Sequence, residues 1–139
     1  MPDVLTTHSE AETTAAGRHL AGTLTAGTTV TLIGDLGAGK TAFVRGLAEG
    51  LGLPPENVSS PTFTLVQEYR GPVTLHHADL YRISSVEADD LGLEELATEK
   101  AIVAIEWAEK LPRPVPGAIV VRFEDLGGDD RRITIERPA

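Results

Sequence analysis

The amino-acid sequence predicts an α/β fold, a three-layer sandwich whose mixed central sheet carries helices on both faces and is completed by antiparallel closing strands. Three observations support this prediction. Residues 29–33 are rich in β-branched side chains and lead directly into a glycine-rich segment and a helical pattern. Residues 101–105 form an uninterrupted apolar run, which is typical of a central strand covered on both faces. Residues 119–123 and 132–136 flank a turn at 127–130 and predict a closing pair of strands.

Two helices are predicted around the first of these strands. Ser9 followed by Glu12 fits a capping box, in which the serine side chain and the glutamate satisfy the first backbone N–H groups of a helix. That helix is expected to run to about residue 24. Residues 40–51 place apolar side chains four positions apart and end before Gly52, so they predict a second helix with one buried face.

The middle of the chain adds two further strands and a short helix. Residues 63–69 and 73–79 are predicted strands separated by a glycine-proline turn. Ser84 and Glu87 form a second capping box, which opens a short helix that Gly92 interrupts. His76 and His77 are adjacent in one of these strands and therefore point to opposite faces, which argues against a two-histidine metal site.

Size and composition limit the class of protein. The 139 residues are expected to form a single domain, residues 1–139, of ordinary globular composition, with 41% hydrophobic and 24% charged residues. The net charge of −9 argues against a broad, charge-driven grip on nucleic acid, which requires many Lys and Arg. The absence of cysteine excludes thiolate chemistry and disulfides. No apolar run is long enough to span a membrane, and no signal peptide is evident, so a cytoplasmic protein is expected.

Residues 34–41 carry the most informative motif, because they match the phosphate-loop pattern G-x-x-x-x-G-K-[ST] at every fixed position. The glycines allow backbone N–H groups to converge on a phosphate, and the following helix adds its positive N-terminal end. Lys40 supplies a cation for the β- and γ-phosphates, and Thr41 supplies a hydroxyl for Mg²⁺. The motif predicts a P-loop NTPase-like fold and a nucleotide site with these further contacts: Asp35, Leu36, Gly37, Ala38, Gly39 and Ala42.

ATP arrives with magnesium, so an acidic residue is expected at the tip of a neighbouring strand. Glu106 follows the most fully apolar strand, and Asp79 follows a more polar one. Glu106 is the first choice, because the Walker B acid follows a buried strand. Two roles are open for Trp107, the only tryptophan: packing in the core, or a position beside the metal acid or at a partner surface.

The segment of residues 59–64 lies between the loop helix and the next strand. Its hydroxyl side chains flank Pro61, which suits a switch loop that senses the γ-phosphate, although an ordinary turn has the same composition.

These motifs, in this order, resemble the bacterial TsaE (YjeE) ATPases of tRNA threonylcarbamoyladenosine biosynthesis. The resemblance rests on the phosphate loop and on four further blocks: residues 60–66 (SPTFTLV), 77–82 (HADLYR), 91–93 (LGL) and 105–107 (IEW). The first two of these blocks are far more specific than the loop alone.

The resemblance implies an ATPase that binds ATP, hydrolyses it slowly by itself and acts with the partner subunits TsaB and TsaD, which hold the tRNA. It implies that Thr41 and Glu106 hold magnesium and that Thr62 is the switch threonine. Asp79 would be a functionally important acid that places the attacking water or couples hydrolysis to the partners. The two remaining positions that it assigns to the nucleotide, near the base, are Thr13 and Arg132.

Two other functions use the same loop. A small-molecule kinase, acting on a nucleoside or sugar, needs a lid with several arginines, and this chain has only 12 Lys and Arg and no insertion to form a lid. A nucleotide-sensing adaptor without useful hydrolysis is disfavoured by the presence of Thr62, Asp79 and Glu106 together.

Overall fold

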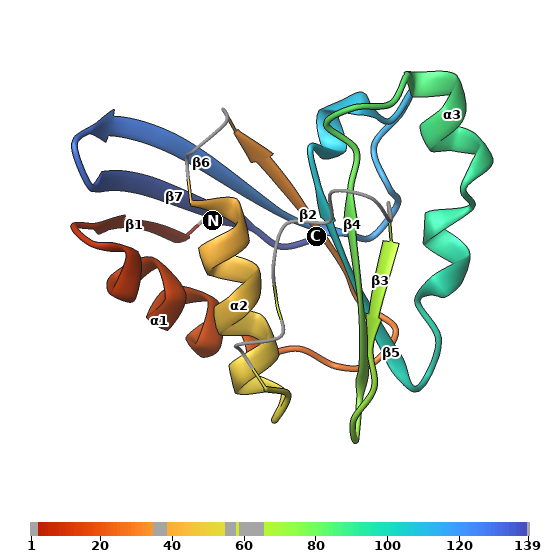
Figure 1. Ribbon diagram of the computed structural model, residues 1–139, viewed down its shortest axis with the longest axis horizontal. Helices are drawn as coiled ribbons and strands as arrows, with labels where there is room; N and C mark the ends of the chain where they lie inside the picture. The colour runs from red at the N-terminus through yellow and green to blue at the C-terminus, as the bar shows by residue number, and fades with distance from the viewer. Residues whose placement is uncertain (1–2, 35–38, 55–57, 59–65, 139) are drawn as a thin grey trace.

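The structure, a computed structural model, describes residues 3–34, 39–54, 58 and 66–138. The described strands form a seven-stranded sheet with the order β1-β7-β6-β2-β5-β4-β3 (Figure 1). Their bounds are β1 (Asp3–Thr7), β2 (Thr29–Gly34), β3 (Val66–Tyr69), β4 (Thr74–Asp79), β5 (Ala101–Glu106), β6 (Ile119–Gly127) and β7 (Asp130–Glu136).

The sheet is mixed, as predicted. The central strands β6, β2, β5 and β4 are parallel to one another, whereas β1, β7 and β3 pair antiparallel at the two edges. Parallel strands end at the same edge of a sheet, so the segments that follow β2, β4 and β5 come together there. The first three residues of the predicted strand 63–69 lie outside the described residues, and the other four form β3.

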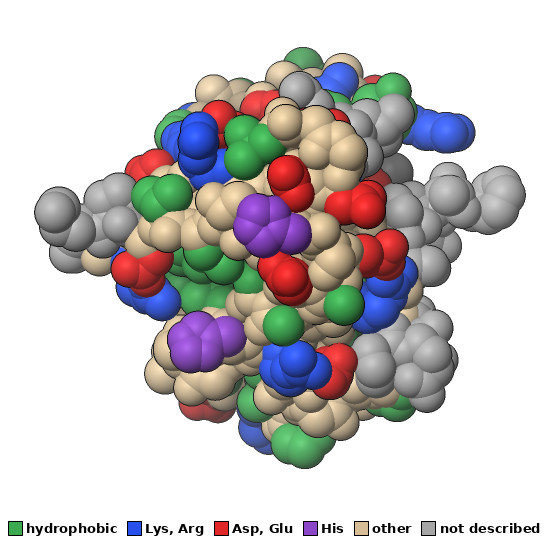
Figure 2. All heavy atoms as spheres, turned by 90° about the vertical axis from the view of Figure 1, so that its left-hand side faces the viewer, with side chains coloured by type: hydrophobic (Ala, Val, Ile, Leu, Met, Phe, Trp, Pro, Cys, Tyr) green, Lys and Arg blue, Asp and Glu red, His purple; other side chains and the backbone are tan. Residues whose placement is uncertain are grey.

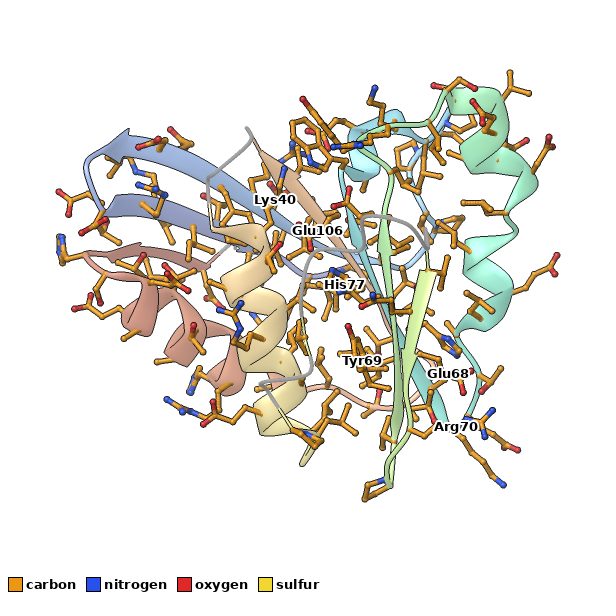
Figure 3. The ribbon with its side chains drawn as sticks, viewed as in Figure 1. Lys40, Glu68, Tyr69, Arg70, His77 and Glu106 are labelled. Atoms are coloured by element: carbon orange, nitrogen blue, oxygen red, sulfur yellow. The ribbon has the colours of Figure 1, made fainter. Side chains whose placement is uncertain are left out.

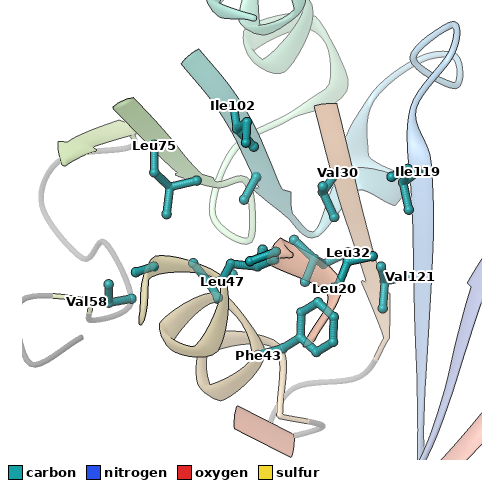
Figure 4. Close-up of a cluster of buried hydrophobic side chains, with 14 of the residues drawn as sticks. Leu20, Val30, Leu32, Phe43, Leu47, Val58, Leu75, Ile102, Ile119 and Val121 are labelled. Carbon is teal, nitrogen blue, oxygen red and sulfur yellow. The ribbon is translucent and has the colours of Figure 1, made fainter. Parts of the chain in front are cut away.

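Helices cover both faces of the sheet, which confirms the predicted three layers (Figure 1). The helices α1 (Glu10–Ala21) and α2 (Lys40–Gly50) lie on one face, over a core that includes Leu32 and Phe43 (Figure 4). The opposite face packs against the helix α3 (Ser85–Asp90) and the short 3₁₀ turns η2 (Leu93–Leu96) and η3 (Ala108–Lys110). Both core clusters are aliphatic in most of their members, since only 4% of the chain is aromatic.

Glycines let α1 and α2 approach closely. A Cβ atom added to Gly17 would lie 2.1 Å from the carbonyl oxygen of Phe43, and one added to Gly46 would lie 1.9 Å from the carbonyl oxygen of Thr14. Both separations are far shorter than a van der Waals contact, so a side chain at either position would force the helices apart. This contact fixes the start of α1 beside the start of α2.

The helix ends follow the predicted capping residues. Ser9 and Ser84 are the N-caps of α1 and α3, and the reciprocal capping box is complete at Ser84 and Glu87. The helix α1 ends at Ala21, short of the predicted residue 24, because the Thr23 hydroxyl binds the Leu20 carbonyl oxygen at 2.8 Å in place of a further helical turn.

None of the helices in the described part of the chain has the length and apolar character required to cross a membrane.

Candidate functional site

A cavity of about 310 Å³ lies at the carboxyl edge of the parallel strands, where α2 begins. It brings together predicted residues from four separate parts of the chain. They come from α1, α2 and the ends of β4 and β5: Thr13, Gly39, Lys40, Thr41, Ala42, Asp79 and Glu106. The predicted contacts at residues 35–38 and the predicted switch residue Thr62 lie outside the described residues.

The first turn of α2 supplies the cationic side of the cavity. Gly39 is the N-cap, with a positive φ of 97° that suits glycine, and Lys40 and Thr41 follow in the first turn. Lys40 is only 4% exposed, although its side chain is charged. Its Nζ donates a hydrogen bond to the Gly34 carbonyl oxygen and lies 3.5 Å from the centre of the Trp107 ring, a cation–π arrangement. The ammonium group and the helix N-terminus thus face the same space, which favours an anion.

Thr41 and Glu106 form the side of the cavity whose oxygen atoms could hold a metal ion. The Thr41 hydroxyl donates to the Glu106 carboxylate, with distances of 3.2 Å to Oε1 and 3.1 Å to Oε2. Mg²⁺ prefers oxygen ligands and is usually held by one or two carboxylates together with phosphate oxygens, so this pair suits it. Among the described residues, no three His, Asp or Glu side chains are grouped to hold a metal by themselves. A magnesium ion here would therefore depend on the nucleotide for further ligands.

Asp79 lies next to Glu106 in the sheet. The two residues are register partners at the ends of β4 and β5, so both carboxylates face the cavity. Asp79 Oδ1 accepts a hydrogen bond from the Tyr81 backbone N–H at 2.9 Å, which fixes the turn after β4. Of the two acids that the sequence left open, Glu106 is the one hydrogen-bonded to Thr41.

Glu106 has a second partner, His77, which the sequence did not connect to the site. The imidazole Nε2 lies 2.5 Å from Glu106 Oε2 (Figure 3). His77 is fully buried, whereas His76 points to the other face, with Nδ1 3.9 Å from Glu68 Oε2. The predicted opposite orientation of the two histidines is thus confirmed. From the sequence, only the alternation of side chains along a strand and the position of Glu106 at the end of a buried strand could have indicated this contact.

Thr13 reaches the site from α1. It is 2% exposed, and its hydroxyl bonds to the Thr7 hydroxyl at 2.8 Å. A Cβ atom at Gly39 would lie 3.3 Å from Thr13 Cγ2, so the threonine sits directly against the exit of the phosphate loop. The close packing of α1 on α2 produces this contact.

Arg132 is not among the described residues that line the cavity. Its side chain is half-exposed, and its Nη1 lies 3.3 Å from Glu124 Oε2. Side chains alternate along a strand, and Ile133 and Ile135 face the helix-covered core, so Arg131 lies on the same side as these residues and Arg132 on the other. Arg131 accordingly lines the cavity.

Trp107 combines the two roles that the sequence left open. It is half-buried, packs against the second core cluster and also lines the cavity, with its ring 4.8 Å from that of Tyr81. Among the described non-glycine residues it alone has a positive φ, 59°, directly after Glu106. Four further lining residues, which the sequence did not predict, lie at the start of α1, on α2 and in the β6–β7 turn: Ser9, Glu10, Arg45 and Asp129.

The family model for the threonylcarbamoyl adenosine biosynthesis protein TsaE matches residues 7–133 of this chain. The chain belongs to the TsaE family. The Bacillus subtilis tRNA threonylcarbamoyladenosine biosynthesis protein TsaE is 41% identical over 125 residues, covering 88% of this chain and 78% of that protein. The protein of the same name from Aquifex aeolicus is 39% identical over 131 residues, covering 93% and 92%.

A solved structure agrees with the family assignment. The crystal structure of Bacillus subtilis YdiB aligns with a TM-score of 0.77 and 33% sequence identity, and it covers 100% of this chain and 87% of that chain. The TsaE family and the α/β fold predicted from the motifs are thereby confirmed.

The surface of this TsaE-family chain carries both signs of charge. Figure 2 shows acidic and basic side chains interspersed over the face that includes β1 and α1. Charged side chains of the chain are also paired, including His8 with Asp130 and Arg137 with Asp3. On the described part of this face the basic side chains do not gather into one patch, in keeping with the net charge of −9.

Proposed function

We propose that this TsaE-family chain is an ATP-binding and slowly ATP-hydrolysing subunit required for threonylcarbamoyl modification of the adenosine next to the tRNA anticodon. The observation that carries the proposal is the convergence of Lys40, Thr41, Asp79 and Glu106 on one cavity at the carboxyl edge of the sheet. A lysine, a hydroxyl and two carboxylates around a helix N-terminus are the groups that P-loop enzymes use for phosphoryl chemistry. The whole chain, residues 1–139, would act as one P-loop ATPase domain.

Lys40 and the N-terminus of α2 would bind the β- and γ-phosphates. The ammonium group already rests on the Gly34 carbonyl and the Trp107 ring, so binding exchanges these contacts for phosphate oxygens. Residues 35–38 would contribute backbone N–H groups, as the loop motif implies. Thr13 and Arg131, on the α1 and β7 sides of the cavity, would contact the remainder of the nucleotide.

Thr41 and Glu106 would hold Mg²⁺, which, when bound, neutralises charge that develops on the phosphates. Their shared hydrogen bond at 3.1 Å keeps the hydroxyl and the carboxylate within reach of one ion. Asp79 lies one strand further along and has Oδ1 occupied by Tyr81 N–H, so its carboxylate is held still where a water could be oriented. Thr62 would act as the switch residue that senses the γ-phosphate.

The mixed surface charge supports a role in which partner proteins, and not this chain, hold the tRNA. A chain with net charge −9 and interspersed charges is poorly suited to hold tRNA by itself. We therefore propose that TsaB and TsaD hold the tRNA and carry out the transfer chemistry in the cytoplasm, with the ATP cycle of this chain read out by those proteins.

Reconstitution tests the proposal. Purified chain, TsaB, TsaD, tRNA, threonylcarbamoyl-adenylate and Mg-ATP are combined, and modified adenosine is measured over many turnovers. We expect multiple-turnover modification with the complete mixture, and loss of it when this chain is omitted or ATP is withheld. Unchanged modification without the chain contradicts the proposal. Rapid phosphorylation of a nucleoside or sugar by the chain alone would instead support a kinase.

A further inference from the structure

The buried pair His77 and Glu106 has no assigned role beyond the metal contact of the glutamate. We infer that His77 is a positioning residue, which holds the Glu106 carboxylate in the orientation that receives magnesium; this inference rests on the proposed function. His77 is 0% exposed and Glu106 is 3% exposed. A carboxylate buried to this degree requires hydrogen-bond donors, and His77 Nε2, at 2.5 Å from Oε2, is one of them.

The sheet register explains how the two side chains meet. His77 is paired with Ala104, and Asp79 is paired with Glu106, so His77 is the diagonal neighbour of Glu106 on the same face. Ala104 has only a methyl side chain, which leaves space for the imidazole to lean along the sheet towards the glutamate. In Figure 3 the labelled side chains of Lys40, Glu106 and His77 follow one another from the cavity into the interior.

The two ends of the imidazole differ. Nε2 contacts Glu106, whereas Nδ1 is buried and has no hydrogen-bond partner among the described residues. A neutral imidazole has one N–H donor and one acceptor, and an orphaned buried N–H is rarer than an orphaned acceptor. The N–H group therefore belongs on Nε2, where it donates to Oε2 of Glu106.

The Glu106 carboxylate is thus held from two sides. Thr41 donates from α2 and His77 donates from β4, so the carboxylate plane is tied to both a helix and a neighbouring strand. If Thr41 turns its oxygen towards a magnesium ion, His77 remains as the donor that keeps the carboxylate in place. Outer partners of this kind typically change metal affinity by about 10- to 100-fold when they are removed.

The test is a calorimetric titration with ADP at a series of Mg²⁺ concentrations, using wild type, His77→Leu and His77→Gln. We expect His77→Leu to raise the Mg²⁺ concentration for half-maximal tightening by about 10- to 100-fold. ADP affinity without Mg²⁺ should stay at the wild-type value. His77→Gln should recover most of the loss, because its amide N–H₂ can donate where Nε2–H does.

His76→Leu is the matched control, because His76 is the next residue on the same strand and faces the opposite side near Glu68. It should leave the Mg²⁺ dependence unchanged. The inference is overturned if His77→Leu keeps the wild-type Mg²⁺ dependence, if His77→Gln is as impaired as His77→Leu, or if both variants lose ADP affinity equally without Mg²⁺. Wild-type and His76→Leu proteins that bind no Mg-ADP would overturn the proposed function itself.

Discussion

Most buried polar side chains in the described part of the chain belong to the site or support it. Lys40, His77, Asp79 and Glu106 are all at most 9% exposed. Each would cost free energy to bury alone. The bond between His77 and Glu106, the bond from the Tyr81 N–H to Asp79, and the contact of Lys40 with the Trp107 ring compensate for lost water. The positive φ of Trp107 lies in the same place, and strained backbone of this kind is typically retained at functional sites. These contacts hold the side chains in place before a nucleotide arrives.

His8 and Asp130 form an exposed, pH-sensitive pair. His8 Nδ1 lies 2.9 Å from Asp130 Oδ1, and the Asp130 carboxylate raises the pKa of His8 above its ordinary value of 6.5. The pair's contribution to stability is therefore complete at pH values below the unfolded pKa and is lost as the pH rises through the raised, folded pKa. An NMR titration of the His8 ring should show this raised pKa.

Asp130→Asn should return the pKa of His8 towards its ordinary value, because the main cause of the shift is removed. Asp129→Asn, at the adjacent acid, should leave it raised. A His8 pKa that stays raised in Asp130→Asn would contradict the assignment.

At the scale of elements, the packing of α1 on α2 sets the geometry of the phosphate loop. Gly17 and Gly46 permit backbone contact between the helices, and this contact brings Thr13 against Gly39. The Thr7 hydroxyl, from β1, then holds Thr13 in place. The first strand, the first helix and the loop helix thus act together, although each is distant from the metal acid in sequence.

Gly46→Ala should destabilise the protein by roughly 1–3 kcal/mol, because the new methyl group would meet the Thr14 carbonyl oxygen at 1.9 Å. Urea denaturation followed by circular dichroism measures the change in the free energy of unfolding. Gly22→Ala is the control, since Gly22 has a φ of −65° and its added Cβ would have only an ordinary contact, 3.5 Å from the His19 carbonyl oxygen. Equal stability of the Gly46 variant and wild type would refute this packing argument.

At the scale of the whole molecule, local sequence patterns are sufficient to predict the central helices and strands. They are insufficient to predict how the strands pair. The apolar run at β5 and the loop motif before α2 are local signals, and both elements lie where they were predicted. The edge strand β1 was not predicted, because its five residues are mostly exposed and their strand conformation depends on pairing with β7, over 100 residues away.

In the site, too, residues marked by local motifs could be predicted, whereas contacts that depend on strand pairing could not. Lys40, Thr41, Asp79 and Glu106 follow from motifs and strand ends, and the cavity unites them. The resemblance assigns Arg132 to the nucleotide, whereas Arg131 lines the cavity; which of two neighbouring residues faces a cavity depends on the pairing of their strand, which the local sequence does not reveal. The contact between His77 and Glu106 likewise depends on the pairing of β4 with β5.

We propose that this cavity binds ATP through Lys40 and magnesium. The most direct measurement is the affinity for ATP, by calorimetry with and without Mg²⁺, of wild type, Lys40→Ala and the exposed-lysine control Lys100→Ala. We predict that Mg²⁺ tightens binding to wild type and Lys100→Ala, and that Lys40→Ala binds about 10- to 100-fold more weakly, because a charge-assisted contact to phosphate is lost. Equal ATP affinity of Lys40→Ala and wild type would contradict the account.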